Sequence, residues 1–178
     1  TGNGKRLRLS RPLDFLVIAD HVENLGIMQK IKAMNPEILE TKAAQRWAEI
    51  SKELGNDFPE SNIQAYQKFR YWVWNDSIGD RDFQKTVWKE VTAQADYYNE
   101  PGKFTAFIGY EWTGIFFNLH RVVIFGDGAD KADRVIPYAQ YDSTEQYGKG
   151  DPEGLWEFMA DYERKTEGSI LAIPHNGN

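Results

Sequence analysis

The stretch FTAFIGYEWTGIFFNLHRVVIF, residues 104–125, decides the fold of this chain of 178 residues. It holds two apolar runs, residues 104–110 and 121–125, with the length and the aromatic and β-branched composition of strands. The segment between the two runs is too short for a crossover helix. We therefore expect the two strands to pair antiparallel.

Two more strand-like runs lie outward from this stretch, at residues 13–19 and 169–173. The first is nearly continuous in apolar residues, which is typical of a strand buried on both faces. Helical spacing of apolar residues, with capping residues, predicts helices over residues 35–54, 61–74, 77–98 and 151–168. This order of strands and helices favours an α/β sheet or part of a barrel.

Composition excludes several classes of protein. The net charge is −6, so a nucleic-acid backbone is not expected as the main partner. Hydrophobic residues make up 41% of the chain, which is enough for a core, and no apolar run approaches the ~20 residues that span a bilayer. Cysteine is absent, which excludes disulfides and thiolate metal sites.

The ends of the sequence suggest a larger protein. The chain begins at Thr1 without methionine or a signal-peptide pattern, and it stops at Asn178 shortly after a strand-like run. We therefore expect a piece of a longer, soluble chain. The compartment stays open between cytoplasm and periplasm.

The three histidines all stand at the edges of strand-like runs. His21 and His175 follow the first and last runs, whereas His120 precedes the third. In α/β folds the carboxyl ends of strands form the site face, and His120 fits this rule only if its strand is antiparallel. Asp20 directly precedes His21, and Glu111 stands at the end of the run of residues 104–110. Imidazole nitrogens and carboxylate oxygens together suit Zn, Mn or Fe(II).

Each of these residues also has a structural interpretation. A single histidine at a strand end is more often a hydrogen-bonded structural residue. Glu111 alone could pair with an arginine, and Asp20 alone could cap the following segment. The grouping of three histidines with two carboxylates at strand ends favours a metal site. Arg121 could bind a substrate phosphate, or it could pair with an acid.

Four pieces of the sequence, in this order, resemble the PHP (polymerase and histidinol phosphatase) superfamily of metal-dependent phosphoesterases. More narrowly, they resemble a large bacterial family of unknown function allied to it. The pieces are residues 15–21, 107–112, 118–125 and 173–176. Residues 26–103 form a helical insertion between the first two pieces.

The resemblance implies part of a distorted (β/α)7 barrel that holds two or three divalent ions (Zn, Mn or Fe). It places five residues at ligand positions: Asp20, His21, Glu111, His120 and His175. The family's opening His-x-His motif, expected before residue 1, and its late Asp-x-His motif, expected after residue 178, are missing. We therefore expect residues 1–178 to form a partial domain, without the N- and C-terminal parts of the barrel and with an incomplete metal set.

The function implied is that of a metal-dependent hydrolase, a phosphoesterase acting on a small phosphate ester through metal-activated water. Glu111 would bridge ions, the histidines would be terminal ligands, and Asp20 would be a ligand or would orient an imidazole. Two alternatives stay open: hydrolysis of amide or other non-phosphate bonds, and a binding or structural module whose metal site has decayed. The isolated chain is expected to be inactive and to associate with itself or with the rest of its parent chain.

Overall fold

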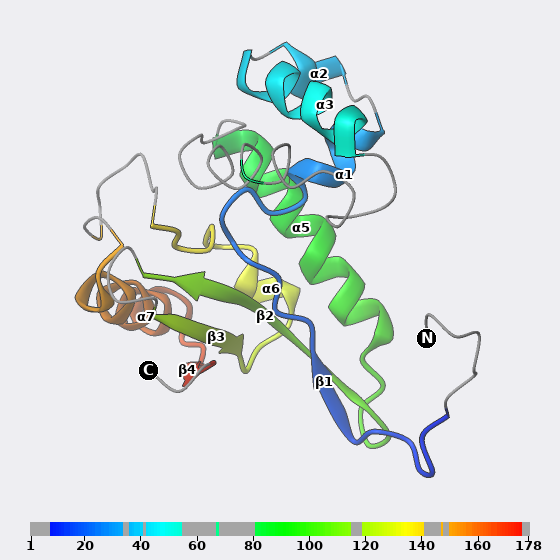
Figure 1. Ribbon diagram of the computed structural model, residues 1–178. Helices are drawn as coiled ribbons and strands as arrows, with labels where there is room; N and C mark the ends of the chain where they lie inside the picture. Colours follow the sequence, from blue (N-terminus) through cyan, green and yellow to red (C-terminus); the bar gives the residue numbers. More distant parts are fainter. Residues whose placement is uncertain are drawn as a thin grey trace.

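The computed structural model describes residues 8–33, 36–40, 42–54, 67, 81–114, 119–140, 147 and 150–175 (Figure 1). These residues form a mixed α/β structure around one open sheet of four strands, in the order β1-β2-β3-β4. The strands are β1 (Phe15–Val17), β2 (Thr105–Thr113), β3 (His120–Phe125) and β4 (Ile170–Pro174).

The helices are α1 (Ile27–Lys32), α2 (Pro36–Leu39), α3 (Lys42–Leu54), α5 (Arg81–Tyr98), α6 (Ala129–Ala132) and α7 (Pro152–Thr166). The predicted helix over residues 35–54 is two helices, α2 and α3, whereas the helix over residues 61–74 falls outside the described residues except for residue 67. The predicted start of α7 is confirmed, because Asp151 Oδ1 accepts a hydrogen bond from the Gly154 N–H at 2.7 Å. Among the described residues, no helix combines the length and apolar character needed to cross a bilayer.

The pairing of the strands agrees with the expected topology in its central part. β2 and β3 pair antiparallel, with Thr113 opposite His120, so this prediction is confirmed. β3 and β4 are also antiparallel. β1 pairs parallel with β2, and the described helices between them in the sequence, α1, α2, α3 and α5, belong to the crossover.

The core lies on one face of the sheet, which α5 and α7 cover together (Figure 1). The Trp88 ring on α5 contacts Phe125 with ring centroids 5.6 Å apart, and Tyr162 on α7 contacts the same phenylalanine at 4.9 Å. Strand alternation places Tyr110 and Trp112 on this face, where both are buried. Their neighbour Glu111 therefore lies on the opposite face of β2.

The face that carries Glu111 is apolar and partly exposed to solvent. Phe15, Leu171 and Ile173 are 64%, 49% and 47% exposed. The prediction that the first strand is buried on both faces is therefore wrong, because β1 lies at an edge of the sheet. The barrel implied by the resemblance is not seen either. In the described part of the chain β1 and β4 each pair on one side only, whereas a barrel needs its first and last strands to pair.

Asp127 joins the end of β3 to the start of β4 and to α7. Its carboxylate accepts hydrogen bonds from the Ser169 N–H at 2.7 Å and the Tyr162 hydroxyl at 3.0 Å, and it lies 3.1 Å from the Lys131 ammonium. Partial desolvation raises the pKa of Asp127, but these three donors outweigh that effect and hold the pKa below its usual range.

Replacing Asp127 by asparagine should lower the free energy of unfolding at pH 7 by about 1–2 kcal/mol, because one oxygen becomes an amide that cannot accept. A carboxyl group whose pKa is lower in the folded chain stabilises it above the unfolded-state pKa of about 3.9. That stability is lost as the pH falls through the folded pKa. Urea titrations should therefore show the two proteins converging at acid pH, and a constant difference across the pH range would contradict this account. Glu163→Gln, on the exposed side of α7, is the control.

Candidate metal centre

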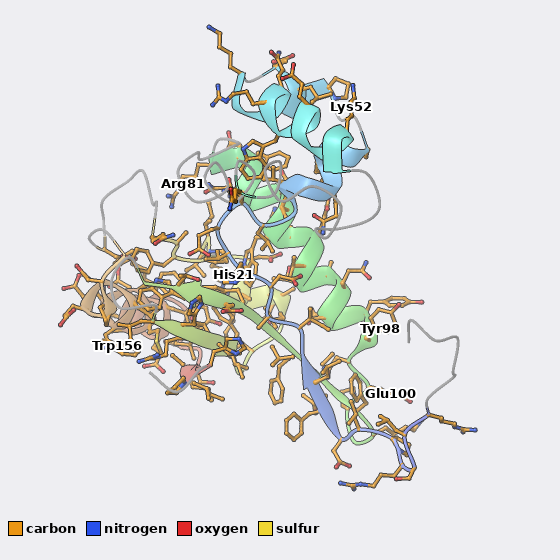
Figure 2. All side chains as sticks on the ribbon, in the orientation of Figure 1. His21, Lys52, Arg81, Tyr98, Glu100 and Trp156 are labelled. Carbon is orange, nitrogen blue, oxygen red and sulfur yellow. The ribbon has the colours of Figure 1, made fainter. Side chains whose placement is uncertain are left out.

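The continuation of β1 along β2 positions the first histidine. The Glu111 N–H donates to the Asp20 carbonyl at 2.8 Å, and the Val22 N–H donates to the Glu111 carbonyl at 3.0 Å. These two bonds bracket His21, which forms a parallel bridge with Glu111. Paired residues lie on the same face of a sheet, so the His21 and Glu111 side chains stand next to each other. Figure 2 labels His21, where the chain after β1 passes over β2.

The other two histidines come from the antiparallel side of the sheet. Because β3 runs opposite to β2, its first residue, His120, lies beside Thr113 at the end of β2. The His175 N–H donates to the His120 carbonyl at 3.1 Å, which extends β4 to the same place. Residues at the ends of the four described strands, or just beyond them, therefore place their side chains at one end of the open face.

One carboxylate oxygen is the common neighbour of the three imidazoles. Glu111 Oε1 lies 2.8 Å from His120 Nδ1, 3.7 Å from His21 Nε2 and 3.8 Å from His175 Nε2. His21, Glu111 and His120 each offer a ligand atom within 4.8 Å of those of the other two. The structure thus brings together four of the predicted site residues: Glu111 and the three histidines.

Two further side chains belong to this cluster and were not predicted. The Thr113 hydroxyl lies 3.0 Å from His21 Nδ1 and 3.3 Å from His120 Nδ1. Thr113 follows Glu111 by two residues, so strand alternation would have placed it on the same face. The Glu23 carboxylate lies 3.5 Å from His21 Nδ1. No simple pattern indicates this contact, because the chain has left the strand at Glu23.

Burial differs within the cluster. The side chains of Glu111 and His120 are 10% and 13% exposed, whereas those of His21 and His175 are 46% and 52% exposed. The Glu23 carboxylate is the largest cause of a raised pKa at His21; partial burial of the ring opposes it, and the Glu111 charge adds to it. The centre therefore has a buried side, formed by Glu111 and His120, and a half-exposed side, formed by His21 and His175.

The donor set fits a divalent transition-metal ion. Ligand atoms bound to zinc at 2.0–2.1 Å in tetrahedral geometry lie about 3.3 Å apart. The three separations from Glu111 Oε1, from 2.8 to 3.8 Å, bracket that value. Within the described residues, His21, Glu111 and His120 thus form a candidate metal site.

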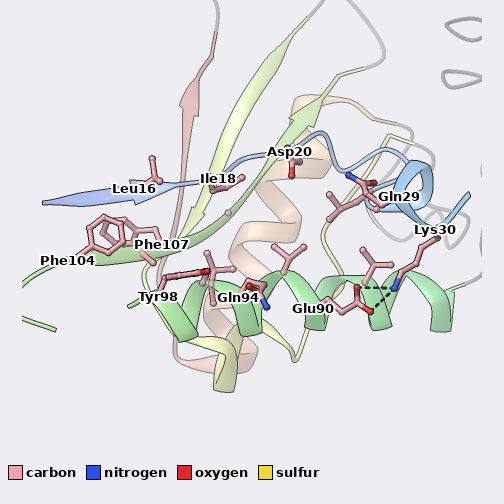
Figure 3. Close-up of a pocket in the computed structure, with 18 of the residues that line it drawn as sticks. Leu16, Ile18, Asp20, Gln29, Lys30, Glu90, Gln94, Tyr98, Phe104 and Phe107 are labelled. Atoms are coloured by element: carbon pink, nitrogen blue, oxygen red, sulfur yellow. Dashed lines mark hydrogen bonds and ion pairs between the residues drawn. The ribbon is translucent and has the colours of Figure 1, made fainter. Parts of the chain in front are cut away.

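The two remaining predicted site residues lie elsewhere. Asp20 precedes His21 along the strand direction, and its side chain lines a cavity of about 780 Å³ between β1, β2 and α5 (Figure 3). Arg121 follows His120 on β3, so its side chain leaves the strand on the opposite face. Its guanidinium donates to the His120 carbonyl at 2.9 Å. The structure does not bring either side chain to the Glu111 oxygen, and their roles in metal and substrate binding stay predictions.

Comparison with known families gives a match over the whole chain. Residues 1–178 match a family model described as a protein of unknown function, DUF3604. The chain therefore belongs to the DUF3604 family. This agrees with the narrower of the two resemblances, that to a family of unknown function. Nothing in the comparison links the chain to the PHP superfamily, and that part of the resemblance stays a prediction. Searches of curated proteins and of solved structures found no match.

Proposed function

We propose that this domain is a metal-dependent hydrolase that uses the cluster around Glu111 to bind a divalent ion. One observation carries the proposal: a single buried carboxylate oxygen lies within 4 Å of a ring nitrogen of each of the three histidines of the sequence. A structural role for three histidines would not require them to share one acceptor. Shared approach to one point is the arrangement that a metal ion requires.

A divalent ion at this position supplies Lewis acidity and lowers the pKa of a bound water from 15.7 toward about 7. Glu111 and His120 would form the buried side of the ion's coordination, because both side chains are nearly enclosed. His21 and His175 would complete the ion's coordination from the half-exposed side of the centre. Since these two imidazoles are half-exposed, water and substrate could approach from the solvent side.

A phosphate ester is the substrate class that we propose. The resemblance to metal-dependent phosphoesterases supports it, and so does the chemistry: divalent ions neutralise the charge that a phosphoryl group carries in its transition state. A second or third ion, with Asp20 as a ligand and Arg121 as a phosphate contact, belongs to this proposal too. So does a closed barrel, which would cover the exposed apolar side chains around Leu171 and Ile173.

The direct test is to load the metal-free protein with Zn²⁺, Mn²⁺ or Fe²⁺, dialyse it, and measure bound metal by elemental analysis. We expect at least one ion per chain. The loaded protein is then assayed for phosphate release from a panel of phosphate monoesters and diesters, beside a panel of amides. Phosphate release supports the proposal, and cleavage of amides alone would reassign the substrate class. Protein that retains no metal would overturn the proposal and favour a binding or structural module.

A further inference from the structure

Glu23 is buried without the partners that a buried carboxylate needs. Its side chain is 2% exposed, and neither carboxylate oxygen has a hydrogen-bond partner within the described part of the chain. Burying a carboxylate without hydrogen bonds costs several kcal/mol in general. The His21 ring lies close to this carboxylate, with Nδ1 3.5 Å from Glu23 Oε2. A residue that costs stability and faces a candidate ligand calls for a functional explanation.

The backbone holds Glu23 in this position. After His21 the chain leaves the sheet through a turn, in which the Leu25 N–H donates to the Val22 carbonyl at 3.2 Å and the Ile27 N–H donates to the Asn24 carbonyl at 3.1 Å. Asn24 has a φ of 57°, a left-handed conformation that asparagine tolerates better than most residues. These two hydrogen bonds therefore fix the backbone of the turn that carries Glu23.

We propose that Glu23 is a positioning residue for the metal centre: its carboxylate accepts the Nδ1–H of His21 and so keeps Nε2 unprotonated and directed at the ion beside Glu111. The inference rests on the proposed function and deepens it. Nδ1 has a second neighbour, the Thr113 hydroxyl at 3.0 Å. A hydroxyl can donate or accept, so it does not decide which nitrogen carries the proton. An ionised carboxylate only accepts, and therefore it does decide.

The two ring nitrogens of His21 face different neighbours, as this proposal requires. Its Nδ1 faces Glu23 and Thr113, whereas its Nε2 lies 3.7 Å from Glu111 Oε1. A metal-binding histidine usually donates its second ring N–H to a carboxylate, a carbonyl or a water, and loss of that partner typically costs 10–100-fold in metal affinity. The His21 side chain is 46% exposed, against 13% for His120, so we expect its orientation to depend more on such a partner.

Two variants and one control test the proposal. Glu23→Leu removes the acceptor, and Glu23→Gln keeps a weaker one. Glu90→Gln, on the exposed side of α5 where Glu90 pairs with Lys30, is the matched control. We expect the Kd for Zn²⁺ to rise about 10–100-fold in Glu23→Leu, less in Glu23→Gln and not at all in the control. The metal-free variants should lose little stability, because the buried Glu23 carboxylate makes no hydrogen bond among the described residues that would offset the cost of burying it. A lower stability with an unchanged Kd would show a purely structural role and overturn the proposal.

A second readout needs no metal. Nitrogen chemical shifts of the His21 ring in the metal-free protein, at a pH where the ring is neutral, report which nitrogen carries the proton. We expect the Nδ1–H form in the wild type and a shift toward the Nε2–H form in Glu23→Gln. An unchanged tautomer would overturn the inference even if Glu23→Leu fails to fold. If the wild type binds no metal, the proposed function fails, and the tautomer measurement still decides the role of Glu23.

Discussion

Replacing Glu111 by glutamine should lower the affinity for a divalent ion by more than about 100-fold. The loss of a direct ligand should exceed the 10–100-fold that removal of a ligand's hydrogen-bond partner typically costs. Glu111 Oε1 is the atom that all three histidines approach, and the substitution removes its negative charge without changing its size. Hydrolytic activity should fall with the bound metal. Isothermal titration of the metal-free protein with Zn²⁺ measures the first effect, and phosphate release measures the second.

The fold should survive this substitution. The amide oxygen of glutamine can still accept a hydrogen bond from His120 Nδ1, which lies 2.8 Å from the carboxylate in the wild type. The melting temperature of the metal-free variant should therefore stay close to that of the wild type. Glu100→Gln, at an exposed turn before β2, is the control and should bind metal normally. Wild-type affinity in Glu111→Gln would place the metal elsewhere and remove the basis of the proposed function.

Replacing Trp88 by alanine should lower the free energy of unfolding by about 3–5 kcal/mol. The side chain is 1% exposed and sits between α5 and the sheet. Its ring contacts Tyr110 edge-on at 6.1 Å, and its Nε1–H donates to the Ala132 carbonyl at 3.0 Å. The substitution removes the ring contacts, leaves a cavity and deprives a carbonyl of its donor. Urea or thermal unfolding measures the loss.

Trp156 provides a control of the same residue type. It lies on α7 with 46% of its surface exposed. Trp156→Ala should cost less than about 1 kcal/mol, because little apolar area returns to water and no buried cavity forms. Equal losses in the two variants would show that α5 does not pack on the sheet as described.

The central part of the fold could be predicted because its signals are local. The short link between the apolar runs of residues 104–110 and 121–125 left an antiparallel pair as the simple solution, and the structure has it. That pairing also brings His120 to the same end of the sheet as Glu111. The histidines meet at one end of the sheet because His21 follows β1, His175 follows β4 and His120 begins β3, which runs antiparallel to β2 and β4.

Other features depend on neighbours that local patterns do not specify. The apolar run at residues 13–19 looks like an interior strand, but β1 lies at the sheet edge and leaves Phe15 exposed. The pair Asp20 and His21 suggested a joint site, yet adjacent residues in extended chain face opposite sides of a sheet. Glu23 comes close to His21 through a turn. Helical and strand periodicities do not predict which residues a turn brings together.

Very different lengths of chain separate the candidate ligands, and this affects how the centre assembles. Thr113 and His120 meet across a short hairpin, whereas Phe15 and Thr105 pair across the whole of α1 to α5. Loop-closure entropy grows with the logarithm of loop length, so the β1–β2 pairing costs about 2 kcal/mol more chain entropy than the hairpin does. We therefore expect Glu111 and His120 to meet first during folding. We expect His21 to join the centre last during folding and to separate from it first during local opening. Glu23, which lies beside His21, therefore belongs to the less stable part of the centre.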